Sequence, residues 1–384
     1  MYRILGIESY FKELKLTIGG TVYGIVESKM FQLMGISAFE RDNMRKEELE
    51  AFYADHTLLG SPKYLQEYSL EHNLTLFNGN TKSYNRYLLS KCDGGRCYCN
   101  IPSLPKFSKD YTLCDIDISG AYTSIMSNLS CHVGSPCIRI FPRQDCITLR
   151  EFIKKYRKEL GDDNYYMRVE GKLKYEQDLI VSFMDSSKGG KWFKHQRKND
   201  SGEDEVYKSL KHDLESTKNK ILTREIEDGA ITPQILEVIL KEFSPRQRDD
   251  FLDNILVKAF IYYPPSMELS GPEEYRQKLT EHEAGIINGT YEFDEKYSDR
   301  EILRPFNYFF KVDYGTYLID IIRTSRSIYK KKKIKSLDLL FKLIGNTSYG
   351  VNVSKCFAMS NIVFANNITG AVRCCIYYAE KALN

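Results

Sequence analysis

The residues best suited to chemistry begin with two aspartates, Asp115 and Asp117, which stand one residue apart at the end of the apolar run TLCDIDI and precede Tyr122. Alternate residues of an extended chain share one face, so both carboxylates project to the same side. Carboxylate oxygens suit Mg²⁺, and substrate phosphate can complete the coordination shell. The spacing therefore indicates a divalent-metal site for phosphoryl transfer, and the alternative is a solvent-facing pair at the end of a strand.

A second set of polar residues falls in FKLIGNTSYG. Lys342, Asn346 and Tyr349 are spaced four and three apart, which places them in one stripe along a helix face. Such a stripe suits a nucleotide, because an ammonium binds phosphate, an amide binds a base or sugar edge, and a ring stacks. The alternative is a solvated helix face with a half-buried tyrosine.

The elements that position these two sets follow from the pattern of apolar residues. Residues 112–118 alternate as a strand, and SGAYTSIMSNL then predicts the start of a helix, with Ser119 as its cap and Gly120 allowing close backbone approach. Apolar residues at helical spacing predict an amphipathic helix over 314–330, and a second helix over about 336–348 follows a lysine run at once. So short a connection predicts an antiparallel hairpin.

The other segments are less specific. A charged helix is predicted over residues 44–55, and residues 146–305 predict a long mixed insert. Within the insert we expect helices near 147–160 and 204–227 and a strand over 165–173.

Length and composition limit the class of protein. A chain of 384 residues with 42% hydrophobic residues can bury a sizeable core and allows two or three domains. No apolar run approaches the roughly 20 residues of a membrane span, and the N-terminus lacks the order of a secretion signal, so we expect an intracellular protein. Ten unevenly spaced cysteines, including the adjacent Cys374 and Cys375, indicate reduced thiols. A net charge of +3 does not by itself indicate nucleic-acid binding, but lysines cluster over 328–335.

Together the two polar sets resemble the motifs of the family B DNA polymerases. DISGAYTS is similar to the family's first motif, D-x-x-S-L-Y-P-S, and KLIGNTSYG is similar to its second, K-x-x-x-N-S-x-Y-G. Gly94 and Gly95 with Arg96 resemble the Y-x-G-G region that precedes the first motif. The long insert, together with SNLSCHVGSPC, resembles the protein-primed branch used by linear plasmids, some phages and related mobile elements. The resemblance covers residues 94–145 and 310–384.

The departures from the family are small within the motifs and large outside them. Gly120, Ala121 and Thr123 replace the family's serine, leucine and proline, and Thr347 replaces a serine. The Y-x-D-T-D hairpin that supplies the other catalytic aspartate is not found, nor are a thumb or the D-x-E and N-x-x-x-D exonuclease signatures. We therefore expect a fragment or a split subunit that is inactive as an isolated chain.

The resemblance implies an α+β fold: a polymerase palm, made of an antiparallel sheet with helices, a two-helix fingers hairpin, and a mixed α/β insert between the motifs. Residues 1–93 would be an exonuclease-like tail and linker, and residues 94–145 the first part of the palm. Residues 146–305 would be the insert, with a terminal-protein region and further palm strands. Residues 306–355 would form the fingers, and residues 356–384 the palm helix before the missing hairpin.

The resemblance also assigns roles to single residues. Asp117 and Lys342 would be catalytic, and Asp117 with the backbone carbonyl of Ile118 would bind metal, in a site of two Mg²⁺ ions once assembled. Tyr122 would exclude a ribose 2′-hydroxyl. The nucleotide-binding residues would be Ser119, Gly120, Ala121, Tyr122, Arg326, Lys330, Lys342, Asn346 and Tyr349. The DNA-binding residues would be Gly94, Gly95, Arg96 and Gly350.

The implied activity is template-directed DNA synthesis in replication, in which a primer 3′-hydroxyl attacks the α-phosphate of a deoxynucleotide. The implied partners are template and primer DNA, deoxynucleoside triphosphates, a terminal protein that supplies the first hydroxyl, and a second polypeptide or chain region with the missing hairpin and thumb. No membrane is implied. The location would be the cytoplasm, or an organelle for an organellar linear plasmid.

Three alternatives stay open. The chain could be a non-catalytic nucleic-acid-binding remnant or assembly subunit that uses its lysine clusters. It could be a nucleotide-sugar glycosyltransferase, in which Asp115-x-Asp117 holds a metal and a sugar diphosphate, although this leaves the stripe around Lys342 unexplained. A zinc site could form from four cysteines, namely Cys92, Cys97, Cys99 and Cys114. Their spacing is unusual for zinc ligands, and buried thiols explain these cysteines better.

Overall fold

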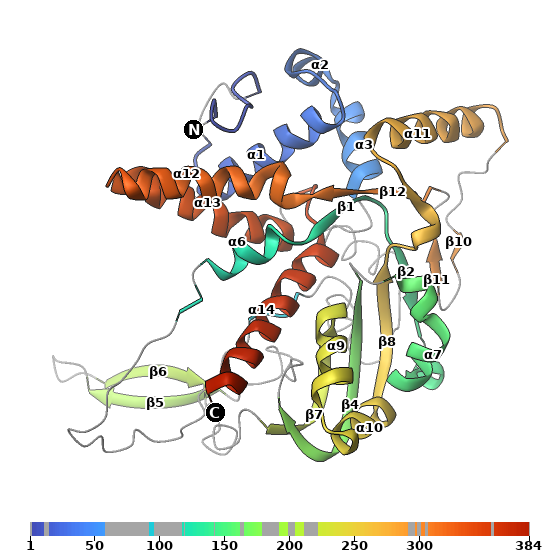
Figure 1. The fold of residues 1–384 in the computed structure, drawn as a ribbon, viewed down its shortest axis with the longest axis vertical. Helices are drawn as coiled ribbons and strands as arrows, with labels where there is room; N and C mark the ends of the chain where they lie inside the picture. Colours follow the sequence, from blue (N-terminus) through green and yellow to red (C-terminus); the bar gives the residue numbers. More distant parts are fainter. Residues whose placement is uncertain are drawn as a thin grey trace.

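The computed structural model has a mixed α+β fold in which helices flank sheets whose strands pair antiparallel, except for the parallel pair β12 (Phe309–Asp313) and β9 (Glu268–Leu269) (Figure 1). It describes residues 2–10, 15–57, 92–95, 117–118, 120–141, 143–161, 165–178, 192–198, 204–210, 222–290, 296–297, 301–303, 306–354 and 357–383. The α+β class expected from the sequence is confirmed. Within these ranges, no helix has both the length and the apolar character that a membrane crossing requires.

The larger sheet has seven strands, and all its neighbouring strands run antiparallel. In spatial order they are β10 (Lys296–Tyr297), β11 (Glu301–Leu303), β2 (Cys137–Ile140), β8 (Ile255–Tyr262), β4 (Tyr166–Asp178) and β7 (Leu222–Ile231), with β3 (Ile147–Thr148) beside β8. Apolar side chains of the sheet pack against α7 (Leu149–Leu160), α9 (Pro233–Glu242), α10 (Pro245–Asn254) and α14 (Ile362–Leu383). Strand β8 is therefore buried along almost its whole length.

The smaller sheet brings the two polar sets of the sequence to one edge. It consists of β1 (Ser130–Gly134), β12 (Phe309–Asp313) and β9 (Glu268–Leu269). Strands β1 and β12 are antiparallel and pair Ser130 with Asp313, so the start of β1 lies beside the end of β12. The helix that precedes β1 and the hairpin that follows β12 must therefore emerge at the same edge.

Two helices follow β12, as the sequence predicts. A π-helical turn, η4 (Gly315–Ile319), leads into α12 (Asp320–Lys331), and residues 332–334 connect it to α13 (Lys335–Val353). The two helices lie side by side in Figure 1. Near the turn, Tyr329 stacks on Phe341 with 5.7 Å between ring centroids, and Arg326 Nε donates to Asp338 Oδ1 at 2.9 Å. The predicted antiparallel hairpin is confirmed.

Three helices lie near the N-terminus, and the first of them packs against α13 of this hairpin. They are α1 (Ile18–Leu33), α2 (Ala38–Asn43) and α3 (Lys46–Thr57), of which α3 confirms the charged helix predicted over 44–55. Val22 and Ile25 of α1 belong to the same buried cluster as Phe341 and Ile344 of α13. Because those α13 residues lie on the face opposite Lys342, the stripe points away from α1.

One prediction for the insert is wrong, and two are confirmed. The helix expected near 204–227 is replaced by β6 (Asp204–Leu210), which pairs with β5 (Trp192–Lys198), and by β7, which pairs with β4; residues 211–221 lie outside the described part. The charged composition favours a helix locally, but β4 offers a strand partner that buries Ile226 and Ile231. The helix near 147–160 is α7, and the strand over 165–173 lies within β4.

Candidate functional site

Three segments that are distant in the sequence meet around two tyrosines, which we call the aromatic pair: Tyr122 and Tyr349. Tyr122 lies on α6 (Ala121–Met126), Tyr349 lies on α13, and their ring centroids are 4.7 Å apart with the planes tilted by 48°. A Cβ atom built on Gly95 would lie 3.3 Å from the hydroxyl oxygen of Tyr122. The Sγ atom of Cys92 lies 3.6 Å from the hydroxyl oxygen of Tyr349. The residues assigned to three separate motifs are therefore in contact.

Helix α6 begins one residue later than predicted. Its N-cap is Gly120, without a side-chain hydrogen bond, so the assignment of Ser119 as the cap is wrong; Ser119 itself lies outside the described residues. Gly120 has a left-handed φ of +60°, which glycine adopts without steric cost. The Ala121 N–H donates to the Ile118 carbonyl at 3.2 Å. This amide and one lone pair of that carbonyl are therefore occupied by a hydrogen bond within the turn.

The two motif-bearing helices touch at a glycine. A Cβ atom built on Gly345 of α13 would lie 2.7 Å from Thr123 Cγ2 of α6, which is closer than such atoms approach in proteins. Only glycine lets the helices come this near. One helical turn further on, this close approach places the ring of Tyr349 against Tyr122.

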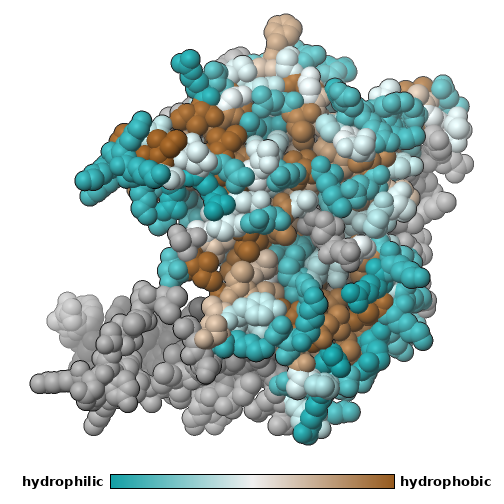
Figure 2. Space-filling view, in the orientation of Figure 1, coloured by the Kyte–Doolittle hydropathy of each residue, from teal (hydrophilic) through white to brown (hydrophobic). Residues whose placement is uncertain are grey.

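The predicted stripe on α13 is present at the surface. Lys342, Asn346 and Gly350 are exposed, whereas Tyr349 is partly buried because it turns toward Tyr122. Leu339 and Leu343 are also exposed on this helix, with 55% and 43% of their surface accessible, and the sequence analysis did not single them out. Figure 2 shows apolar side chains among hydrophilic ones over this hairpin.

The two candidates for a second cation differ in their surroundings. Arg326 is bound to Asp338 across the hairpin at 2.9 Å, so its charge is engaged in holding α12 to α13. Lys330 is exposed in the last turn of α12. The resemblance assigned both to the nucleotide, and of the two Lys330 is the more exposed.

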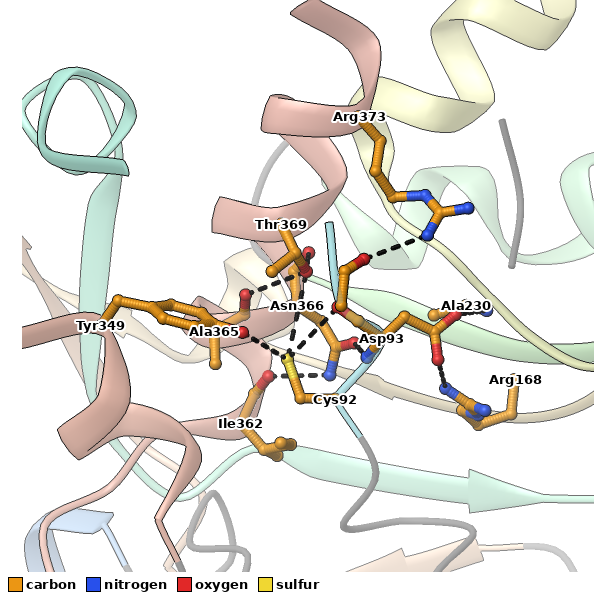
Figure 3. Close-up of polar contacts among 11 residues, drawn as sticks. Cys92, Asp93, Arg168, Ala230, Tyr349, Ile362, Ala365, Asn366, Thr369 and Arg373 are labelled. Atoms are coloured by element: carbon orange, nitrogen blue, oxygen red, sulfur yellow. Dashed lines mark hydrogen bonds and ion pairs between the residues drawn. The ribbon is translucent and has the colours of Figure 1, made fainter. Parts of the chain in front are cut away.

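Residues 92–95 are held by a buried polar network that the sequence analysis missed (Figure 3). The Asp93 carboxylate accepts from Arg168 Nη1 at 3.2 Å and from the Ala230 N–H at 2.8 Å. The Asp93 N–H donates to Asn366 Oδ1 at 3.2 Å, and Arg373 Nη1 donates to the Gly94 carbonyl at 3.0 Å. The loop is therefore attached to the larger sheet and to α14 at once.

The two hydroxyl groups of the aromatic pair and the Cys92 thiol beside them are uncharged at neutral pH. Burial raises the pKa of the Cys92 thiol to about 12, and it raises the pKa values of the Tyr122 and Tyr349 hydroxyls, with the nearby Cys92 adding to both shifts. All three therefore keep their protons. The pair offers neutral ring surfaces and hydroxyl groups, not an acid or a base for catalysis.

The metal site expected at the first motif is only partly within the described residues. Asp117 and Ile118 are exposed and are not part of a strand, whereas Asp115 and the rest of the strand predicted over 112–118 lie outside the described part, as does Arg96. No cluster of three or more acidic, histidine or cysteine side chains suited to a metal occurs among the described residues. Of the expected metal ligands, the structure therefore gives positions only for Asp117 and Ile118.

The cysteines suggested for zinc are not brought together within the described part. Cys92 contacts Tyr349 and Thr369, and Cys97, Cys99 and Cys114 lie outside the described residues. The six described cysteines, including Cys374 and Cys375, form no disulfide bond with one another.

Comparisons of the chain with family models, with curated proteins and with solved structures find no match.

Proposed function

We propose that this chain is the palm and fingers part of a family B DNA polymerase of the protein-primed branch. The contact between Tyr122 and Tyr349 carries the proposal, because it joins the segments that resemble the family's first and second motifs, with 4.7 Å between their ring centroids. Gly95, from the region that resembles Y-x-G-G, lies close to the hydroxyl group of Tyr122. Three resemblances found separately along the sequence thus coincide in space, as a shared substrate would require.

In this proposal the nucleotide binds along α13. Lys342 and Asn346 are exposed on the side of the helix that leads to Tyr349, so the ammonium can reach phosphate and the amide can reach a sugar or base edge. The neutral rings of the aromatic pair supply a stacking and packing surface. Tyr122 occupies the space that a ribose 2′-hydroxyl would need.

Asp117 would hold one Mg²⁺ together with the triphosphate. Bound there, the ion would neutralise phosphate charge, while the residues of this chain bind and orient the nucleotide. A second carboxylate must come from outside the described residues. We therefore propose that synthesis requires a further chain region or polypeptide that carries it, and that the isolated chain binds nucleotide weakly and polymerises little or not at all.

A nucleic-acid-binding subunit without chemistry is the second candidate. Lysines 330–333 and 335 are exposed at the tip of the hairpin, and clustered cations bind nucleic-acid phosphates without further machinery. A glycosyltransferase is less well supported, because holding a sugar diphosphate at Asp117 gives no role to the contact between Tyr122 and Tyr349.

The experiment that separates these candidates measures whether DNA and nucleotide bind in a template-directed way. A fluorescent primer–template duplex is bound to the chain with Mg²⁺, and its dissociation rate is measured with each of the four deoxynucleoside triphosphates. We expect the nucleotide complementary to the next template base to slow dissociation about tenfold, equivalent to about 1.4 kcal/mol. Equal rates with all four nucleotides would favour the binding subunit, and a stronger effect of a nucleotide sugar would favour the glycosyltransferase.

Replacing Tyr122 with alanine is expected to relax the choice of sugar. The ring that packs against Tyr349 is the group that would block a 2′-hydroxyl. Its removal should lower the preference for deoxynucleotide over ribonucleotide by about threefold to tenfold, the scale of a lost packing contact. Competition between the two nucleotides in the duplex assay measures this preference. Tyr122→Phe keeps the ring and should keep the preference; unchanged rejection of ribonucleotides in Tyr122→Ala would refute the assignment.

A further inference from the structure

The loop over residues 92–95 is held from two separate parts of the fold. The larger sheet binds the Asp93 side chain through Arg168 of β4 and the backbone of Ala230 in β7. Helix α14 binds the loop backbone through Asn366, which accepts from the Asp93 N–H, and through Arg373, which donates to the Gly94 carbonyl. Figure 3 shows these contacts arriving at the loop from different sides.

A buried aspartate such as Asp93 is unusual in a loop that only connects two elements. Its side chain is 4% exposed and that of Arg168 is 0% exposed, so both charges are removed from water. A buried charge is retained only where hydrogen bonds and an opposite charge satisfy it, and each of those contacts fixes its direction. The carboxylate uses one oxygen for Arg168 and the other for Ala230, which leaves the loop a single position relative to β4 and β7.

That position matters because the loop's other residues touch the aromatic pair. Cys92 places its sulfur 3.6 Å from the hydroxyl oxygen of Tyr349, and Gly95 lies so close to Tyr122 that a Cβ atom would sit 3.3 Å from its hydroxyl oxygen. Asp93 and Gly94 lie between Cys92 and Gly95 in the sequence, and these two residues make the contacts to the larger sheet and to α14. Any displacement of Asp93 must therefore move the residues that border both rings.

We propose that Asp93 is a positioning residue that couples the larger sheet to the aromatic pair, holding Cys92 against Tyr349 and Gly95 against Tyr122. The positioning itself follows from the contacts of the loop. Its effect on substrate rests on the proposed function, since the choice of nucleotide is set by a surface of which this loop forms one border.

The replacement Asp93→Asn tests the proposal with little change in shape. An asparagine offers one oxygen and one NH₂ group, so either Arg168 or the Ala230 N–H would face a donor instead of an acceptor. A second ion pair on the same sheet provides the control: Lys258 of β8, with a side chain 0% exposed, lies 2.5 Å from Glu170 of β4, whose side chain is 31% exposed. Glu170→Gln disturbs a charge on the same strand but not in the loop.

The first measurement is the alkylation rate of Cys92 by iodoacetamide, determined for each cysteine peptide by mass spectrometry. The thiolate is the reactive form, and partial burial with a pKa of about 12 keeps Cys92 slow in the wild-type chain. We expect Asp93→Asn to raise the rate at Cys92 by about tenfold or more, because the loop leaves Tyr349 and the thiol becomes hydrated. The rate at Cys137, buried in β2, should stay unchanged, and Glu170→Gln should change neither.

The possible results separate positioning from general loosening. An equal rise at Cys92 and Cys137, or no rise at Cys92, would overturn the proposal. If Asp93→Asn does not fold, Arg168→Lys takes its place, because it keeps a positive charge beside Asp93 but removes the guanidinium group that donates to Asp93 Oδ1. That variant should also raise the rate at Cys92 alone.

The second measurement connects the loop to substrate. In the duplex assay, Asp93→Asn should reduce the preference for complementary deoxynucleotide over ribonucleotide, and Glu170→Gln should leave that preference unchanged. Suppose that Asp93→Asn raises the alkylation rate at Cys92, but that duplex dissociation from the wild-type chain does not depend on the nucleotide. The proposed function would then be refuted, and the positioning role of Asp93 would stand. If the wild-type chain selects the complementary nucleotide and the variants do not change the alkylation rate at Cys92, the positioning role would be refuted and the proposed function would stand.

Discussion

Replacing Gly345 with alanine is expected to lower the free energy of unfolding by about 1 to 3 kcal/mol, the usual cost of overpacking a core. The new Cβ atom would lie 2.7 Å from Thr123 Cγ2. Thr123 cannot easily turn away, since it is buried and β-branched and its Oγ1 donates to the Gly120 carbonyl at 2.9 Å. Helices α6 and α13 would have to separate, and urea unfolding measures the cost.

The same change should also weaken nucleotide selection, because separating the helices draws Tyr122 away from Tyr349. Gly350→Ala is the matched control, since it lies on the same helix and a Cβ atom there meets nothing within 4 Å. Alanine is the better helix former, so this variant should be more stable by up to about 1 kcal/mol. If Gly345→Ala proved as stable as Gly350→Ala, the close packing of α6 on α13 would be wrong.

The features predicted correctly from the sequence are those encoded by nearby residues. The apolar spacing over 314–330 and the short lysine run were sufficient to predict two antiparallel helices, because helical periodicity and a three-residue connection are local properties. The stripe of Lys342, Asn346 and Tyr349 follows from the same periodicity. Its exposure, with Tyr349 partly buried, agrees equally with a nucleotide-binding stripe and with a solvated helix face.

The features that were missed depend on residues far away in the chain. Asp93 reads as an ordinary loop residue before two glycines, and its side-chain and backbone partners lie 75, 137 and 273 residues further on. Similarly, residues 222–231 have a composition that permits a helix, and only the edge of β4 makes them a strand. The cap of α6 was misplaced because the left-handed turn at Gly120, not the side chain of Ser119, decides where the helix begins.

The glycines carried a signal that the sequence analysis used only in part. Gly345 stands inside a predicted helix, where glycine is costly, and such a glycine indicates close packing when a second helix is expected nearby. Combined with the tyrosine four residues later, it could have predicted the contact between α13 and α6.

Replacing Lys342 with alanine is expected to weaken binding of the complementary deoxynucleotide by about 10-fold to 100-fold, because a charged hydrogen bond to phosphate contributes about 1.5 to 3 kcal/mol. Lys342 is exposed on the stripe, and a bound triphosphate would cover it and exclude water. Lys332→Ala is the control, since it removes the same charge from the exposed turn of the hairpin. It should reduce affinity for the duplex in a salt-dependent way and leave nucleotide selection unchanged. The nucleotide dependence of duplex dissociation measures both variants. A loss of less than about twofold for Lys342→Ala, or equal losses for the two variants, would mean that the stripe contributes only its charge and that the nucleotide binds elsewhere.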